Sequence, residues 1–219
     1  NDLPVLVVKP LTPTVKEAKK LVDLVEERSL YAAVEFHKRY DKANLMIRDK
    51  IQSDVLGDLL YCWVEYSQRK SIPTEVFKAW TEKTSILQYL GVHYIDIVRF
   101  ATNAKPKRVM ALGQKNWLPS QGFDAFDAIQ CFIEWRLPNG SLFTQTILTN
   151  WIDPESSSAM SDQKIKLVGT NQQIIVDETM LLLNDSEAYQ KMAYAHNPYG
   201  DGTASKKIME ALLNYERMT

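Results

Sequence analysis

The sequence predicts an α/β chain that begins inside a parallel strand–helix–strand layer and continues into a mainly antiparallel sheet with helices. Two observations predict this fold class. The first 36 residues hold a short apolar run, a capped amphipathic helix and a second short strand. From Lys107 onward strand patterns dominate, and the turn signal Pro138-Asn139-Gly140 sends one strand back antiparallel to its neighbour.

The opening segment has the pattern of a βαβ unit. Leu3 to Val8 is a continuous apolar run, which predicts a buried strand of the parallel kind. Thr14 and Glu17 have the spacing of a capping box and predict the start of a helix, and Leu30 to Phe36 reads as the next strand. Because such a unit needs a larger parallel sheet to join, we expect a truncated chain.

The rest of the chain is expected to alternate helices with strands. Asp41 to Ser53 predicts a helix, Leu59 to Ser67 a strand, and Pro73 the first residue of a short helix that ends near Trp80. Further elements are a helix over Ser85–Thr102, strands over Asp127–Leu137, Ser141–Asn150, Lys164–Val168, Gln173–Val176 and Met180–Leu183, and a closing helix over Ala204–Tyr215. In the strand over 127–137 one face is apolar and comprises Ile129, Cys131, Ile133 and Trp135.

Composition and charge exclude several classes of function. Apolar residues make up 45% and charged residues 24% of the chain, and the net charge is −1. Such a balance argues against a nucleic-acid partner or an anionic membrane surface. No run approaches 18 apolar residues and no signal segment opens the chain, so we expect a cytoplasmic protein that does not span a membrane.

Cysteines and glycines offer little chemistry. Cys62 and Cys131 lie in apolar stretches and are expected to be buried, reduced thiols. The 3 histidines and 2 cysteines are far apart in the sequence, so no metal site is expected. None of the 8 glycines forms the GxGxxG pattern of a dinucleotide-binding loop, so a phosphate cradle within this chain is not expected.

Two places could carry chemistry. Lys9 and Pro10 follow the first strand at its carboxyl end, where open α/β sheets bind their ligands, and on position alone an exposed charge at the rim is the first alternative for Lys9. His93 and Asp96 lie three residues apart on one face of the predicted helix. Gly91 in the same helix would let another segment approach closely, and a core histidine bonded to Asp96 is the alternative interpretation.

Several segments of the sequence, taken together, resemble one protein family. The run Val5-Leu6-Val7-Val8-Lys9-Pro10-Leu11-Thr12, followed by a capped helix, resembles the V-x-x-E-K-P-L segment of the glucose–fructose oxidoreductase/inositol dehydrogenase (Gfo/Idh/MocA) family. His37-Lys38-Arg39-Tyr40-Asp41 resembles the stretch that leaves the cofactor domain, and Gly91 to Asp96 resembles the helix motif D-x-G-x-H-x-x-D. Leu137 to Gly140 and Val168 to Thr170 resemble a sheet hairpin and a GT-x-G turn, with order and spacing agreeing to about residue 200.

The resemblance implies a domain organisation. Residues 1–36 would be the C-terminal remnant of a Rossmann-type dinucleotide-binding domain, and residues 37–219 the α/β domain for substrate binding and oligomerisation. The second domain would have a large open sheet with helices on one face. In this family that sheet often makes the oligomer contact, so we expect a homo-oligomer. The aromatic residues that could form such a surface, or alternatively belong to the core, are Tyr61, Trp63, Trp135 and Trp151.

The resemblance also implies an activity: hydride transfer between NAD or NADP and a sugar, polyol or related hydroxy or keto compound. The motif lysine matches Lys9, which would hydrogen-bond the reacting hydroxyl and, with Pro10, contact the cofactor. The motif histidine matches His93, which would exchange the proton, as suits an imidazole. Arg39, Tyr89 and Asp96 are the expected substrate-binding residues, with a surface ion pair as an alternative for Arg39.

Two positions depart from the family pattern. Val8 replaces the glutamate before the motif lysine, and Tyr89 replaces the aspartate four residues before the histidine. A phenol forms hydrogen bonds but brings no negative charge at neutral pH. Two alternatives therefore stay open beside the dehydrogenase: a family member that uses NAD in glycoside hydrolysis, and a catalytically weakened binding or assembly protein.

Overall fold

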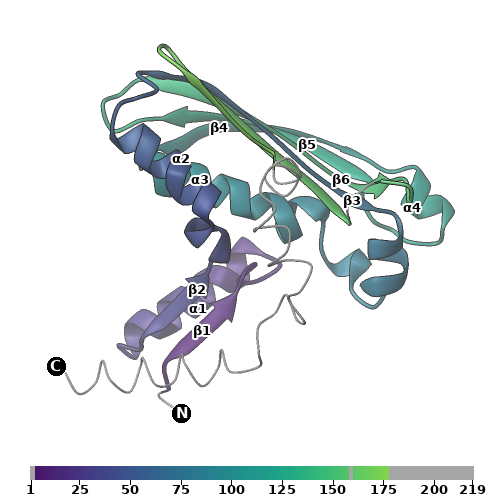
Figure 1. Ribbon diagram of the computed structural model, residues 1–219. Coiled ribbons are helices and arrows are strands. Elements are labelled where there is room, and N and C mark those ends of the chain that lie inside the picture. The colour runs from purple at the N-terminus through teal and green to yellow at the C-terminus, as the bar shows by residue number, and fades with distance from the viewer. Residues whose placement is uncertain (1–2, 158–159, 178–219) are drawn as a thin grey trace, which may run out of the picture. The chain divides into compact units, whose positions relative to one another are not determined.

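Two separate β-sheets organise the chain in the computed structural model, which describes residues 3–157 and 160–177 (Figure 1). A two-stranded sheet pairs β1 with β2, and a six-stranded sheet has the order β4-β5-β6-β3-β7-β8. The described residues all fall within one compact unit. None of their helices has the length and apolar character that a bilayer crossing needs.

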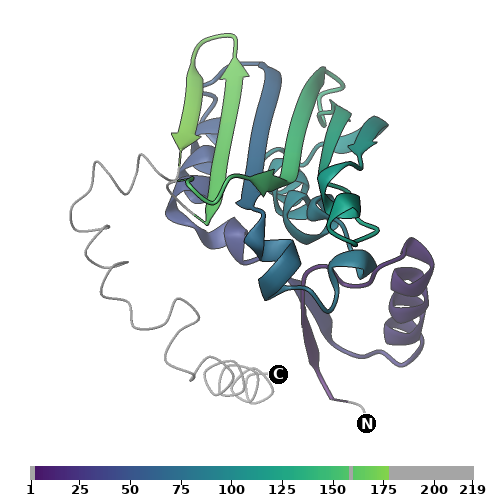
Figure 2. The same ribbon diagram turned by 90° about the vertical axis from the view of Figure 1, so that its right-hand side faces the viewer.

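The predicted βαβ unit is present. β1 (Val5–Val8) pairs in parallel with β2 (Ala32–Glu35), and α1 (Val15–Glu27) connects them (Figure 2). Thr14 is the N-cap of α1: its Oγ1 accepts a hydrogen bond from the Glu17 N–H at 3.2 Å and donates one to the Glu17 carboxylate at 2.7 Å. The capping signal in the sequence therefore starts the helix where it was expected.

The prediction that the first strand is buried is wrong. Val5, Leu6 and Val8 expose 47%, 44% and 61% of their surface, and α1 buries none of its residues. The reason is the size of the layer, because two strands and one helix cover little of one another's surface. A continuous apolar run indicates a strand that can be covered on both faces, but within the described residues β1 has β2 alone beside it.

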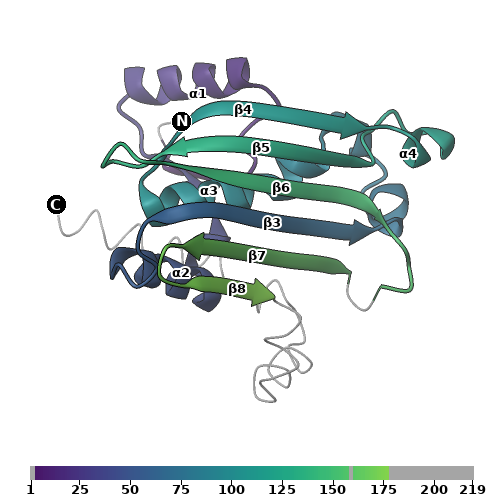
Figure 3. The same ribbon diagram turned by 90° about the horizontal axis from the view of Figure 1, so that it is seen from above.

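The larger sheet is mainly antiparallel, as predicted. Its strands are β3 (Leu59–Arg69), β4 (Lys105–Gln114), β5 (Ala128–Arg136), β6 (Leu142–Asp153), β7 (Ser161–Gly169) and β8 (Gln173–Asp177). β3 and β6 are parallel, and the other four neighbouring pairs are antiparallel (Figure 3). The predicted turn at residues 138–140 closes the β5–β6 hairpin, with Gly140 at a φ of +91°.

Helices pack against one face of this sheet. α2 (Lys42–Gln52) and α3 (Val92–Thr102) lie on the same side (Figure 1). The core between helices and sheet contains Ile97 and Val98 of α3 with Ile133 and other residues of the strands. The predicted apolar face of β5 is buried: Cys131, Ile133 and Trp135 belong to this core, and Ile129 is buried as well. The predicted open sheet with helices on one face is therefore confirmed.

The helix predicted over Ser85–Thr102 differs in its first part. Leu87–Gly91 forms a π-helical turn, and the α-helix α3 begins only at Val92. A Cβ at Gly91 would lie 2.6 Å from Leu87 Cδ1 and 3.2 Å from Thr149 Cγ2, so the glycine lets this turn press against β6. The close approach expected at Gly91 is therefore confirmed.

The short helix expected from Pro73 to Trp80 is also smaller than predicted. A π-helical turn spans Ile72–Val76 with Pro73 in its first turn, and a separate 3₁₀ turn spans Thr81–Lys83. A four-residue α4 (Trp117–Ser120), which was not predicted, precedes β5. The predicted strand Met180–Leu183 and helix Ala204–Tyr215 lie outside the described residues.

The cysteines and sheet aromatics divide between core and surface. Cys62 and Cys131 are buried and free, as predicted. Trp135 and Trp151 are fully buried, so for these two the core interpretation holds. Tyr61 is 40% exposed and Trp63 half-buried. Since Cys62 and Val64 point into the core, Tyr61 and Trp63 lie on the sheet face that the helices leave open.

Candidate active site

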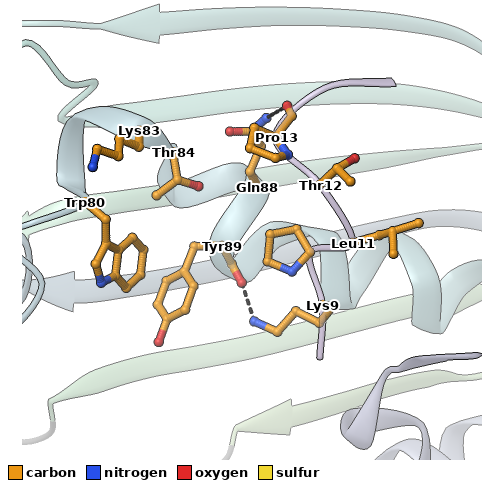
Figure 4. A pocket seen from close by; sticks show the side chains of 10 residues that line it. Lys9, Leu11, Thr12, Pro13, Trp80, Lys83, Thr84, Gln88 and Tyr89 are labelled. Carbon is orange, nitrogen blue, oxygen red and sulfur yellow. Dashed lines mark hydrogen bonds between the residues drawn. The ribbon is translucent and has the colours of Figure 1, made fainter. Parts of the chain in front are cut away.

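Lys9 links the small layer to the helical segment beside the large sheet. Its ammonium group donates a hydrogen bond to the main-chain carbonyl of Tyr89 and lies 4.6 Å from the centroid of the Tyr89 ring (Figure 4). Only 7% of the Lys9 surface is exposed. The alternative that Lys9 is an exposed charge at the rim is therefore wrong.

A pocket of about 370 Å³ lies beside Lys9. One wall is the chain that follows β1, and the other comprises the residues that lead into α3 (Figure 4). Gln88 joins the walls, since its side-chain amide donates a hydrogen bond to the Pro13 carbonyl at 3.0 Å. The lining residues are Lys9, Pro10, Leu11, Thr12, Pro13, Trp80, Lys83, Thr84, Gln88 and Tyr89.

His93 lies one helical turn after Tyr89 and is 2% exposed. Its ring is 4.6 Å from that of His37 and 6.2 Å from that of Phe36. Nδ1 of His93 has no hydrogen-bond partner among the described residues. A buried imidazole nitrogen without a partner is unusual and is typical of a position that a ligand or a proton-transfer partner completes.

The electrostatics around Lys9 and His93 are dominated by positive charge. Burial, helped by the charges of Lys9, His37 and Lys38, lowers the pKa of His93 to about 2. Burial and the Lys38 charge lower the pKa of Lys9 to about 8, against a smaller opposite effect of Glu35. At neutral pH the site thus holds an ammonium group on Lys9 and a neutral imidazole on His93.

Arg39 and Asp96 form an ion pair with each other. Arg39 Nε and Nη2 donate to the two Asp96 carboxylate oxygens at 2.7 and 2.6 Å, and this pairing raises the pKa of Arg39. The Arg39 guanidinium also lies 5.2 Å from the Phe36 ring and 5.3 Å from the Phe100 ring. Among the described residues no hydrogen bond joins His93 to Asp96, which pairs with Arg39 instead, so the alternative of a core histidine bonded to Asp96 is wrong.

Tyr89 belongs to an aromatic cluster at the pocket wall. Its ring centroid is 5.4 Å from that of Phe77, 5.2 Å from that of Trp80 and 6.5 Å from that of Trp151. The ring therefore packs among aromatics, while the Tyr89 main chain holds Lys9. The structure brings Lys9 close to Tyr89 and His93, which follow it by about 80 residues in sequence. Lys9 and Tyr89 line the pocket, and His93 is not among its lining residues.

Three residues near the site were not predicted from the sequence to belong to it. Trp80 and Lys83 line the pocket, and Lys38 is a second buried lysine whose Nζ lies 3.4 Å from Asp41 Oδ2. Trp80 and Lys83 belong to no motif, and their one signal is that they shortly precede Tyr89. Lys38 lies in the stretch from His37 to Asp41, but no role was predicted for Lys38 itself. Among the described residues, no group of three His, Cys, Asp or Glu side chains could hold a metal ion.

Comparison with known proteins identifies the domain. Residues 44–175 match the model of the GFO/IDH/MocA C-terminal domain. The fold resembles an inositol dehydrogenase homologue from Azotobacter vinelandii in complex with NADH and myo-inositol (TM-score 0.68, 17% identity, 81% of this chain and 45% of that chain). It also resembles the myo-inositol 2-dehydrogenase of Lactobacillus plantarum (TM-score 0.66, 16% identity, 80% and 50%). The chain thus spans about half of these proteins.

A second match covers the end of the chain. Residues 153–213 match the UDP-N-acetylglucosamine 2-epimerase family model. The enzyme of that name from Escherichia coli is 50% identical over 60 residues, which are 27% of this chain and 16% of that enzyme. The two models overlap on residues 153–175, which include Val168 to Thr170. That turn is therefore shared by both family models, and the epimerase match was not predicted from the sequence motifs.

Proposed function

Because the chain belongs to the GFO/IDH/MocA family, we propose that it is part of an NAD(P)-dependent oxidoreductase. The substrate would be a sugar, a polyol or a related hydroxy or keto compound. One observation supports this most: Lys9, buried after β1, meets the segment that leads to His93. The complexes of similar fold support it too, since one is named for NADH with myo-inositol and another, from Lactobacillus casei, for NAD(H) with scyllo-inositol.

The proposed domain organisation assigns each sheet a role. Residues 1–36 would be the last part of the cofactor domain, consistent with the parallel pairing of β1 and β2. Residues 37–219 would form the domain for substrate binding and oligomerisation, and the family model begins within it at residue 44. The choice between NAD and NADP would lie in residues outside this chain, because open α/β sheets bind dinucleotides at loops that these residues do not include.

Lys9 and His93 would share the proton chemistry. Lys9 would donate a hydrogen bond to the reacting hydroxyl and stabilise alkoxide character as it develops. His93, neutral at physiological pH, would accept the hydroxyl proton through the nitrogen that lacks a partner. Because its pKa of about 2 makes it a weak base, this role requires negative charge on the ligand to offset the positive neighbours of the imidazole. A bound nicotinamide would supply the hydride acceptor, and Pro10 with Lys9 would form the contact to it at the pocket wall.

The remaining proposed site residues would act on the substrate in different ways. Tyr89 lines the pocket directly and presents an aromatic surface beside Lys9. Arg39 and Asp96 do not line the pocket, so their proposed role requires one donor of the Arg39 fork to leave Asp96 and turn to a substrate oxygen. The alternatives of NAD-assisted hydrolysis and of a non-catalytic protein have less support, since the similar structures named above are dehydrogenases by name.

We further propose a cytoplasmic homo-oligomer that associates through the open face of the six-stranded sheet. Tyr61 and Phe132 are exposed on that face, 40% and 44% respectively, and large exposed aromatics are typical of interfaces. Light scattering on the purified protein tests this proposal. A monomeric mass at micromolar concentration would contradict it.

A second candidate function follows from the match at residues 153–213. A protein that shares 50% identity over 60 residues with an epimerase could bind the same nucleotide sugar. Calorimetric titration with UDP-N-acetylglucosamine tests this idea. Absence of heat at millimolar ligand would remove the candidate.

The first experiment is a fluorescence titration of NADH and NADPH. It uses this chain and, in parallel, the product of the complete reading frame that contains it. If only the longer protein binds, the division into cofactor and substrate domains is supported, and substrates should be screened with that form. If neither protein binds either nucleotide, the oxidoreductase proposal is wrong.

A further inference from the structure

We propose that the pocket beside Lys9 selects substrates with an anionic group, a carboxylate or a phosphate, and that Lys83 recognises that group. The inference deepens the proposed function, and it rests on that function for the role of the reacting end at Lys9. It adds the substrate class, which the family alone does not give.

The first step is the charge of the lining. Of the 10 residues around the pocket, Lys9 and Lys83 carry positive charge and none carries a carboxylate. The acid next to Lys83 in sequence is Glu82, but its carboxylate accepts a hydrogen bond from the Asp124 N–H at 2.7 Å. Within the described residues Lys83 forms no ion pair, so its charge is available to a ligand.

The second step is the state of Lys9. Both of its direct partners belong to Tyr89 and neither is charged: one is a carbonyl group and the other an aromatic ring. The Tyr89 side chain therefore brings an aromatic ring and no carboxylate to Lys9. Burying a cation without an opposite charge costs free energy, and a ligand with an anionic group lowers that cost.

The third step is the shape of the pocket. The two walls are joined at Lys9–Tyr89 and again at Pro13–Gln88, so the hollow is held by hydrogen bonds. Figure 4 shows Trp80 and Tyr89 between Lys83 and Lys9. The volume of about 370 Å³ lies at the small end of ligand pockets. It suits a single sugar ring with its reacting hydroxyl at Lys9, its face on the aromatic rings and its anionic group toward Lys83.

The experiment compares matched ligands that differ only in the anionic group. Glucose, glucuronate and glucose 6-phosphate are titrated by calorimetry into the full-length protein, with and without NADH, and their kcat/KM values are measured. We expect at least one anionic ligand to exceed glucose about tenfold or more, which corresponds to 1.4 kcal/mol. The two anionic ligands separate a carboxylate site from a phosphate site.

Variants of Lys83 connect this preference to the residue. Lys83→Gln should reduce the ratio of anionic to neutral ligand to about threefold or less, and Lys83→Arg should retain most of it. Lys50→Gln, which changes an exposed lysine on α2, is the matched control and should leave the ratio unchanged. Because Lys83 is itself exposed, its variants should fold as well as the control.

Any of three results would overturn the inference. Glucose could bind as well as both anionic ligands, or Lys83→Gln could keep the preference or alter only the choice between NADPH and NADH. In the last case Lys83 would bind the phosphate group that distinguishes NADPH from NADH. Failure of the proposed function looks different: no nicotinamide binds and no ligand turns over, while calorimetry still reports whether the pocket prefers an anion.

Discussion

The Lys9 ammonium group donates its hydrogen bond to the main-chain carbonyl of Tyr89, and not to a side chain. The tether between the end of β1 and the turn before His93 is therefore independent of the side chain at position 89. This relationship explains how the chain keeps the lysine in place without an aspartate there. It also leaves Lys9 without the full negative charge that would hold its proton, in line with a pKa lowered to about 8.

The pKa of Lys9 predicts a fall of activity in alkali. Below pH 8 the amine is protonated and can stabilise an alkoxide, and above pH 8 the protonated fraction falls about tenfold per pH unit. We therefore expect kcat/KM for oxidation to decrease above pH 8. In Lys9→Arg the guanidinium stays charged, so the residual activity should lose this alkaline limb. A wild-type rate that rises through pH 8 would show instead that the neutral amine is the active form.

His93 should be needed for turnover but not for cofactor binding. Removal of a general base typically lowers the rate by about 10²–10⁴-fold, so His93→Ala should lose kcat by that factor. Its Kd for NADH should stay within about twofold of the wild type. His37→Ala is the control, since this second histidine contacts the His93 ring yet is half exposed. Equal kcat in His93→Ala and wild type would remove the proton-transfer role.

The buried His93 should also make the protein less stable in acid. Its pKa is about 2 in the folded state and near 6.5 when unfolded, so below pH 6.5 the unfolded chain binds a proton that the folded one does not. Stability is therefore lost as the pH falls from 6.5, on the order of 2 kcal/mol by pH 5. Urea unfolding of wild type and His93→Leu at both pH values measures the difference. Parallel pH dependence in the two proteins would mean that His93 is protonated in the folded state.

The elements were largely predictable because their signals are local. The Thr14 cap, the alternation from Ile129 to Trp135 and the turn at Gly140 each depend on residues near one another in sequence, and all three were confirmed. The exposure of β1 was not predictable in this way. An apolar run shows that a strand can be buried on both faces, but it does not show which elements will cover it. The described residues do not cover the side chains of β1.

The site was predictable only through the resemblance. Lys9 and His93 each have a weak local signal, and only the fold brings the two segments together. Lys83 and Trp80 belong to no motif, and only their position shortly before Tyr89 points to them, because a pocket wall needs no periodicity. The pairing of Arg39 with Asp96 likewise depends on a contact over 57 residues, which no spacing rule could anticipate.

The contribution of the Arg39–Asp96 ion pair to stability can be tested by mutation. Asp96 is nearly buried and Arg39 about one-third exposed, so the pair lies between surface and buried ion pairs. Asp96→Asn should lower the free energy of unfolding by about 1–3 kcal/mol. In a double-mutant cycle with Arg39→Met, the second change should add little. If the two losses simply add, the side chains are not coupled, and separate roles toward a substrate become the better explanation.

Tyr89→Asp tests the dehydrogenase against the non-catalytic alternative. The new carboxylate would lie near Lys9 and His93, raise the pKa of Lys9 and move its alkaline limb upward. The change also removes a ring that packs on Phe77 and Trp80, so we expect a loss of about 3 kcal/mol in stability. Tyr89→Phe keeps the ring and is the control for stability. If the native protein turns over no polyol and only Tyr89→Asp becomes active, the ordinary mechanism was lost at this position. Comparable native activity would instead show that Lys9 works with a main-chain carbonyl as its partner.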